Sequence, residues 1–124
     1  MQDQPTAADL VMAVREFIES VAMPSLQGHA AFHARVAANA LAIVERELAI
    51  APGANAAERA RLETLLGRDG TLEDLNWALC DAIRAGRVDA ATPGLREHLW
   101  ETTLAKLAID QPRYAAYRRA IEEG

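Results

Sequence analysis

Apolar residues recur every three or four positions through most of this chain, which is the spacing of amphipathic helices. Over residues 7–22 the pattern places on one face Leu10, Val14, Phe17, Ile18 and Val21. Thr6 stands before this pattern as an N-cap, and Pro24 predicts its end because proline has no N–H to donate. The first predicted element is therefore a helix of residues 7–22.

A second helical pattern, the longest, runs from about residue 29 to residue 50. Pro52-Gly53 predicts a break after it, and a separate helix follows over residues 55–66 with Gly67 as its C-cap. The second helix carries two apolar sectors, which lie more than about 100° apart around the axis. They are, first, Phe32, Val36, Ile43 and Ile50 and, second, Leu41, Val44 and Leu48. Two apolar sectors imply neighbours on both sides, so we expect this helix to be central.

Three further helices are predicted in the remainder of the chain. Thr71, followed by Asp74 three residues later, resembles a capping box for a helix that Gly86 closes. Thr92 and Pro93 begin a fifth helix that extends to about Ile109, and a short last helix follows Pro112. No segment alternates with period two, so no strand is predicted.

The fold class predicted from these patterns is all-α. We expect residues 1–124 to form a single-domain helical bundle of five main helices plus a short C-terminal helix, with residues 1–6 as a flexible N-terminus. The connections between helices are short, which favours antiparallel neighbours.

Charge and composition narrow the possible functions. The net charge is −5, and basic residues are not clustered, which argues against nucleic acid and anionic membranes as partners. One cysteine cannot form an intrachain disulfide, and the N-terminus lacks the pattern of a signal peptide. No apolar run approaches the roughly 18–20 residues that span a bilayer. We therefore expect a cytoplasmic protein.

Standard catalytic motifs are absent, including phosphate-binding loops, dinucleotide-binding glycines, serine-hydrolase elbows and zinc-peptidase helices. The nearest metal-like spacing is that of His29 and His33, which lie one helical turn apart, but a site needs a third ligand. Glu47 lies some 20 Å farther along the helix, and nothing requires His98 to approach. We expect no metal and no cofactor.

The single cysteine and the aromatic residues are interpreted as structural. Cys80 lies in the middle of a helix beside Asp81, which disfavours a reactive thiolate, so a buried thiol is predicted. The aromatic residues at helical spacing are predicted to be core, and they are Trp77, Trp100, Tyr114 and Tyr117.

The second helix raises the main functional question, because polar residues interrupt its apolar pattern. Arg35, Asn39 and Arg46 form a stripe at the margin of the Phe32 sector, and Glu47 projects inside it. The favoured interpretation is a buried hydrogen-bond network, in which Glu47 pairs with an arginine such as Arg84 or Arg113.

A binding pocket is the alternative interpretation of the same stripe. In it, Arg35 and Arg46 hold a carboxylate or phosphate, while Asn39 orients it. The candidate ligand-binding residues are then Arg35, Asn39, Arg46, Glu47 and His33.

Five segments in chain order resemble an uncharacterised bacterial family of short all-helical domains. They are PTAADLVMAVREFIESVAMPSL, GHAAFHARVAANALAIVERE, LNWALCDAIRAG, PGLREHLWETTLAKLAID and QPRYAAYRR. Members of that family are found fused to, or encoded beside, aminoglycoside-phosphotransferase-like kinases and acyl-CoA dehydrogenases. The resemblance implies a partner of one of these enzyme classes, on a separate polypeptide.

Three functional hypotheses follow from the sequence. The leading one is a non-enzymatic accessory or interaction domain that works with a phosphotransferase-like or acyl-CoA-metabolising enzyme. The second is an anionic-ligand-binding or enzymatic domain with its pocket at Arg35, Asn39 and Arg46. The third is a homodimerisation module that buries the Trp100 or Tyr117 face.

Overall fold

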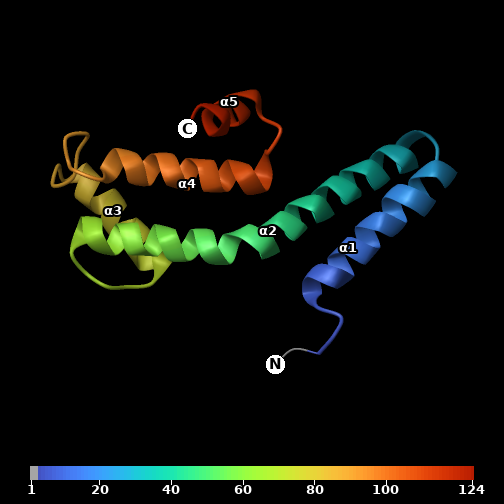
Figure 1. Cartoon of the computed structure of the whole chain (residues 1–124), viewed down its shortest axis with the longest axis horizontal. Helices are drawn as coiled ribbons and strands as arrows, with labels where there is room; N and C mark the ends of the chain where they lie inside the picture. The colour runs from blue at the N-terminus through green and yellow to red at the C-terminus, as the bar shows by residue number, and fades with distance from the viewer. Residues whose placement is uncertain (1–2) are drawn as a thin grey trace. The chain divides into compact units, whose positions relative to one another are not determined.

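The structure, a computed structural model, describes residues 3–124, and all their regular structure is helical (Figure 1). The helices are α1 (Ala7–Phe17), α2 (Gly28–Leu66), α3 (Leu72–Arg84), α4 (Leu95–Asp110) and α5 (Ala115–Glu123). A π-helical turn, Ile18–Ala22, and a 3-10 turn, Met23–Ser25, follow α1. The predicted all-α fold class is confirmed.

Contacts divide the chain into two compact units, Met1–Ala49 and Ile50–Gly124. The first unit contains α1 and the N-terminal part of α2, and the second contains the rest of α2 with α3, α4 and α5. The expected flexible N-terminus falls partly on residues 1–2, which lie outside the described residues. Residues 3–6 precede the first helix without regular structure. That residues 1–124 form a single domain stays a prediction.

Helix α1 begins where the sequence predicts, because Thr6 and Asp9 form a reciprocal capping box. Asp9 N–H donates to Thr6 Oγ1 at 3.2 Å, and Thr6 N–H donates to the Asp9 carboxylate at 2.9 Å. These hydrogen bonds hold the pKa of the Asp9 carboxyl below its ordinary value. Helical turns continue to Ser25, so Pro24 ends the element one turn later than expected.

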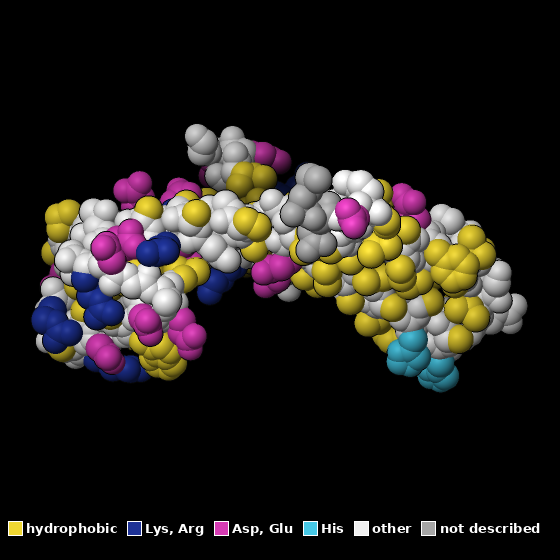
Figure 2. Space-filling view, turned by 90° about the horizontal axis from the view of Figure 1, so that it is seen from below, with side chains coloured by type: hydrophobic (Ala, Val, Ile, Leu, Met, Phe, Trp, Pro, Cys, Tyr) yellow, Lys and Arg dark blue, Asp and Glu magenta, His cyan; other side chains and the backbone are white. Residues whose placement is uncertain are grey.

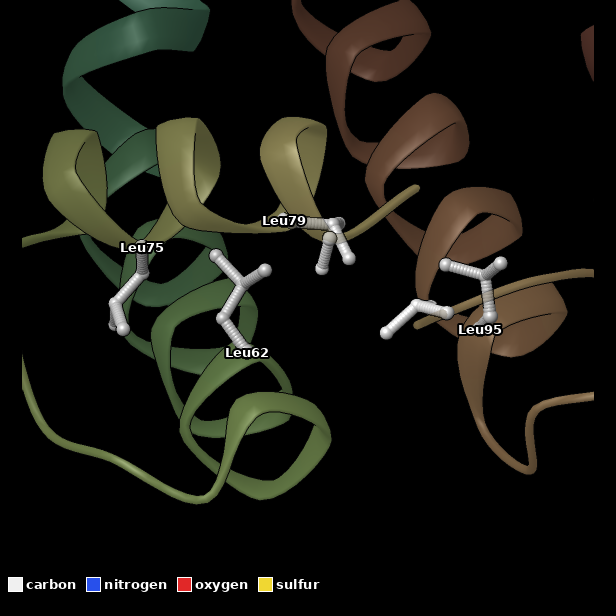
Figure 3. Packing of buried hydrophobic residues seen from close by; sticks show 6 residues of the cluster. Leu62, Leu75, Leu79 and Leu95 are labelled. Atoms are coloured by element: carbon white, nitrogen blue, oxygen red, sulfur yellow. The ribbon is translucent and has the colours of Figure 1, made fainter. Parts of the chain in front are cut away.

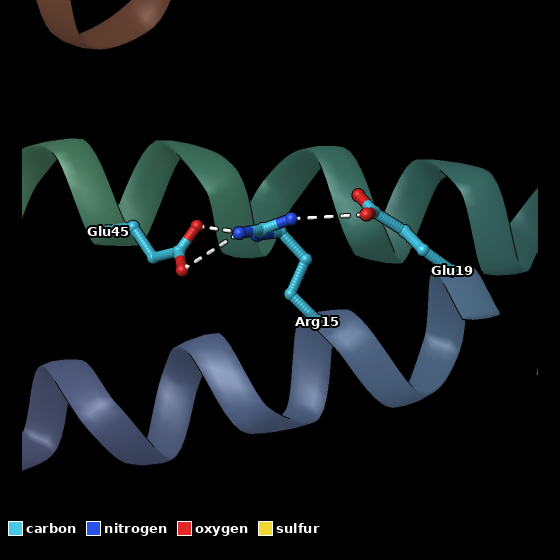
Figure 4. A network of polar contacts seen from close by, with 3 residues as sticks. All are labelled: Arg15, Glu19 and Glu45. Atoms are coloured by element: carbon cyan, nitrogen blue, oxygen red, sulfur yellow. Dashed lines mark hydrogen bonds and ion pairs between the residues drawn. The ribbon is translucent and has the colours of Figure 1, made fainter. Parts of the chain in front are cut away.

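In the first unit, α1 and α2 run antiparallel as a hairpin, which we call the α1–α2 hairpin (Figure 1). Arg15 of α1 joins the two helices, because its Nε and Nη2 both donate to the Glu45 carboxylate of α2 (Figure 4). Arg15 Nη1 donates to Glu19 at 3.1 Å. The hydrogen bond to Glu45 raises the pKa of Arg15, so its guanidinium stays charged. Within residues 3–49, only Ala38 is buried.

The second unit has a larger core, built mainly of leucine (Figure 3). Its buried residues are Leu62, Leu75, Leu79, Ala82, Val88 and Leu95. They come from α2, α3, α4 and the loop between α3 and α4, so one cluster ties these segments together. At its edge, Asn76 Nδ2 donates to Glu58 at 3.0 Å and links α3 to α2.

The predicted break at Pro52-Gly53 is wrong, since both residues lie inside the 39-residue helix α2. Proline costs about 3 kcal/mol relative to alanine in a helix interior. That cost is offset because residues on both sides of it pack: Ala51 is buried, and Leu62 lies in the leucine core. Two predicted helices are therefore one, and residues 3–124 contain five α-helices rather than the predicted six.

Some helix ends lie where the sequence predicts them, and the start of α4 does not. Gly67 and Gly86 have positive φ, and Thr71 accepts the Asp74 N–H at 3.1 Å, as expected. Thr92 does not cap α4. Its hydroxyl accepts from Asp89 N–H at 2.9 Å, while Gly94, with φ of 89°, is the N-cap. The loop thus uses Thr92 internally, and α4 begins two residues after the predicted Pro93.

Replacing Gly53 by alanine tests the continuous helix. A Cβ at Gly53 meets nothing within 4 Å, and the helical backbone suits alanine. We expect Gly53→Ala to raise the free energy of unfolding by about 0.5–1 kcal/mol, measured with urea. Gly67→Ala is the matched control, because its Cβ is equally unobstructed but φ is +64°. It should destabilise, by roughly 1 kcal/mol. Loss of stability in Gly53→Ala would contradict a helix running through this position.

Candidate functional site

The polar stripe of α2 lies at the surface. The side chains of Arg35, Asn39 and Glu47 are exposed, and that of Arg46 is half-buried. Glu47 therefore does not point inward as predicted, because its side chain is exposed. Glu47 projects into the Phe32 sector, which the sequence predicts to be buried. That sector is itself exposed, so a residue within it is exposed as well. Phe32 is 58% exposed, and its ring meets His33 edge to face, with centroids 5.5 Å apart.

Alanine rather than larger residues marks the inner side of α2 in the first unit. Ala38 is buried, and Ala31, Ala34 and Ala42 are half-buried at helical spacing. Glu45 continues this line, which explains why it, and not Glu47, reaches a partner helix. The helical spacing of these alanines is the feature of the sequence that indicates the inner side of α2. The larger apolar residues of α2 obscure it, because large apolar side chains are usually the ones expected to be buried.

A cavity of about 380 Å³ lies in the second unit. It is lined by Ala60, Arg61, Thr64 and Leu65 of α2, and by Thr92, Pro93, Gly94 and Glu97 at the start of α4. Its volume is within the range of small-molecule sites, roughly 300–1,000 Å³. None of the five candidate ligand-binding residues from the sequence lines this cavity. Nothing in the local sequence distinguishes Arg61 from other helix arginines, so sequence reasoning missed it.

Arg61 carries the positive charge of the cavity wall. It is half-buried, and its Nη2 donates to Thr102 Oγ1 at 3.2 Å. Its Nε is buried and has no hydrogen-bond partner among the described residues. Gly94 adds the N-terminal end of α4, which favours negative charge, while Glu97 places a carboxylate opposite. Such a wall suits a small ligand that bears an acceptor or anionic group.

His98 of α4 is the one buried titratable side chain among the described residues, at 2% exposed. Its Nδ1 has no hydrogen-bond partner in residues 3–124. Burial lowers the pKa of its imidazole below the ordinary 6.5, and the charge of Arg61 lowers it further, against a smaller effect of Glu58. His98 is therefore neutral at physiological pH.

The structural interpretation of Cys80 and the aromatics needs correction. Cys80, Trp77, Trp100 and Tyr114 are exposed, and Tyr117 is half-buried. Leu75, Leu79 and Ala82 supply the buried face of α3, and Cys80 follows Leu79 by one position, about 100° around the helix. The buried face of α3 is therefore narrower than the number of hydrophobic residues in this helix predicts.

Comparison with known protein families matches residues 24–114 to a family described as a domain of unknown function, DUF6285. The chain belongs to this family. The matched residues of the DUF6285 domain contain α2, α3 and α4 completely, and with them the Arg61 cavity, while α1 precedes them. The comparisons with curated proteins and with solved structures found no match.

Two specific features are absent from residues 3–124. No group of three or more His, Cys, Asp or Glu side chains is arranged to hold a metal ion. No helix in this range combines the length and apolar character required to cross a membrane.

Titration of His98 should make stability depend on pH. Its pKa is lower in the folded state, so the unfolded chain binds a proton first as pH falls below about 6.5. The free energy of unfolding should therefore decrease from about pH 7 toward pH 5.5. His98→Gln should flatten this slope in urea titrations, whereas His33→Gln, at an exposed position, should not. An unchanged slope in His98→Gln would show that other groups produce it.

Proposed function

We propose that this chain is an accessory domain that acts by binding another protein chain. The observation that carries this proposal is an apolar surface on the α1–α2 hairpin, which we call the hairpin face (Figure 2). It consists of Leu10, Val14, Phe17 and Val21, together with Val44 and Leu48 of α2. These six side chains are between 42% and 58% exposed.

The size of the hairpin face supports contact with a protein. Six half-exposed side chains of this kind offer on the order of 500 Å² of apolar surface, near the upper end of what a typical monomer exposes in one patch. Large apolar side chains stabilise a fold when they are buried, by roughly 1.5–3 kcal/mol each. A surface that leaves six of them half-exposed is more typical of an interface than of a free face.

The small core of the first unit also supports contact between the hairpin face and another protein. Helices of this length are marginal in water unless an amphipathic face is packed. Here α2 contributes mainly alanine to the contact with α1, and Arg15 with Glu45 supplies the long-range polar contact. Packing of the hairpin face against another chain would supply the missing apolar burial.

The partner classes come from the family resemblance. We propose a phosphotransferase-like kinase or an acyl-CoA dehydrogenase, on a separate polypeptide in the cytoplasm. The enzyme would provide the chemistry, and this domain would bind to it.

Co-purification tests the proposed partnership. We expect the full chain, carrying an affinity tag, to retain a phosphotransferase-like kinase or an acyl-CoA dehydrogenase from its own cells. Phe17→Ser should reduce this capture at least about 10-fold, since aromatic anchors dominate interfaces. Trp77→Ser is the control, because Trp77 is similarly exposed, at 61%, but lies in the second unit. Absence of capture by the unmodified chain would remove the link to these enzymes.

A second candidate function is the binding of a small anionic ligand, and the Arg61 cavity is the observation that favours it. A half-buried guanidinium with an unpartnered Nε beside a helix N-terminus can hold a carboxylate or phosphate. The stripe of Arg35, Asn39 and Arg46 remains a competing location for such a ligand.

A thermal-shift screen with acyl-CoAs, nucleotides and phosphorylated small molecules separates these locations. A ligand present at 100 times its dissociation constant stabilises the folded state by about 2.7 kcal/mol, which raises the melting temperature measurably. We expect Arg61→Ala to abolish a shift that Arg35→Ala retains. The reverse result would place the ligand on the α2 stripe, and the absence of any shift in this screen would count against ligand binding.

A further inference from the structure

Both helices of the hairpin carry the residue spacing of a helical seam. On α1 and the turn after it, Leu10, Val14, Phe17 and Val21 are separated by four, three and four positions. On α2 the same spacing recurs at Ala37, Leu41, Val44 and Leu48. A repeat of four and three is the pattern by which helices pack in coiled coils and four-helix bundles. No charged residue occupies a position in either seam.

The two seams lie on the same side of the hairpin. The Arg15–Glu45 pair marks the sides of α1 and α2 that meet. At about 100° per residue, the α1 seam lies about 130° from Arg15 and the α2 seam about 70° from Glu45, in the same rotational sense. Because the helices are antiparallel, these rotations bring both seams to one face, and Figure 2 shows hydrophobic side chains gathered over it.

A hairpin with two exposed seams on one face is half of a four-helix bundle. The missing half must be two antiparallel helices of similar length whose own seams are apolar and uncharged. A second copy of this hairpin meets each requirement, and a two-fold axis brings the same face of both copies together.

The apolar area also fits a second copy. A standard interface takes about 800 Å² from each partner, of which about 65% is apolar in homodimers, or roughly 500 Å². That is the area estimated for the hairpin face. A small peptide would leave much of the face uncovered, whereas an identical hairpin covers both seams along their whole length.

We infer that the hairpin face joins two copies of this chain, whose α1–α2 hairpins form an antiparallel four-helix bundle. This inference rests on the proposed function, because it names the first protein chain that the hairpin face binds. The exposed sector of Phe32, Val36 and Ile43 lies on the side of α2 turned away from α1. It remains outside the dimer contact and is available to the enzyme. Capture of the enzyme then depends on Phe17 through the dimer, because two linked copies bind a partner more tightly than one.

Analytical ultracentrifugation of the full chain tests the inference. We expect twice the chain mass of 13.4 kDa at micromolar concentration. Phe17→Ser should raise the dimer dissociation constant at least about 30-fold, the loss expected for an aromatic anchor. Phe32→Ser is a closely matched control, since both phenylalanines are 58% exposed and lie in the same unit. It should leave the dimer unchanged.

A cross-linking experiment avoids dependence on a destabilised variant. In a Cys80→Ser background, which removes the one native thiol, Val14→Cys should give a covalent dimer with a flexible thiol-specific cross-linker. Phe32→Cys in the same background should stay monomeric on a non-reducing gel. Circular dichroism of each variant confirms that its helices remain.

The outcomes separate this inference from the proposed function. A monomer at every concentration, without Val14→Cys cross-links, overturns the second copy. If Phe17→Ser then still reduces capture of the enzyme, the interaction domain stands and the enzyme itself occupies the hairpin face. If neither dimer nor capture is found, both proposals fail. The inference is also overturned by a dimer that Phe17→Ser does not weaken and that Val14→Cys does not cross-link, because such a dimer forms through another face.

Discussion

On the α2 side, the contact between α1 and α2 is made mainly by alanine, and the exposed apolar surface of the first unit depends on it. Alanine lets two helices approach closely but removes little apolar area from water. The positions that face inward are taken by Ala31, Ala34, Ala38 and Ala42, with Glu45 held by Arg15 at the end of the line. On the other helix, Val11 and Ile18 share the side of Arg15 and are half-buried, whereas the hairpin-face residues lie on another side and are exposed. An apolar outer surface is thus a direct consequence of a small-residue interior.

The second unit has the opposite arrangement, because large apolar residues fill its core. Leu62 and Leu75 are completely buried, and the remaining core residues surround them. This core fixes the C-terminal part of α2 against α3 and α4, and it places Arg61 beside the start of α4. A rigid leucine core with a small cavity at its edge is a suitable support for ligand recognition. The two units are therefore suited to different kinds of binding.

Features set by local chemistry were predictable from the sequence. Thr6, Thr71, Gly67 and Gly86 act as expected, because caps depend on a few neighbouring residues. The sequence predicts a break at Pro52, but the helix continues through it. The free-energy cost of a proline within a helix is outweighed by packing that the sequence does not display.

The candidate site was harder to predict than the fold. Helical periodicity identifies apolar sectors but not which sector is covered, so Glu47 was assigned to the interior in place of Glu45. The Arg61 cavity combines residues some thirty positions apart, at Arg61 and Gly94, and depends on how α4 packs. Such long-range juxtapositions carry no periodic signal, since each wall alone resembles an ordinary helix surface.

Pro52 has a consequence for how α2 opens. Because proline has no N–H, the carbonyl of Leu48 loses its usual donor four residues later, and the hydrogen-bond ladder is interrupted within the helix. We expect amide protons on the two sides of this gap to belong to different cooperative units of local unfolding. One helix of 39 residues would then exchange with deuterium as two separate segments, each at the rate set by its own unit.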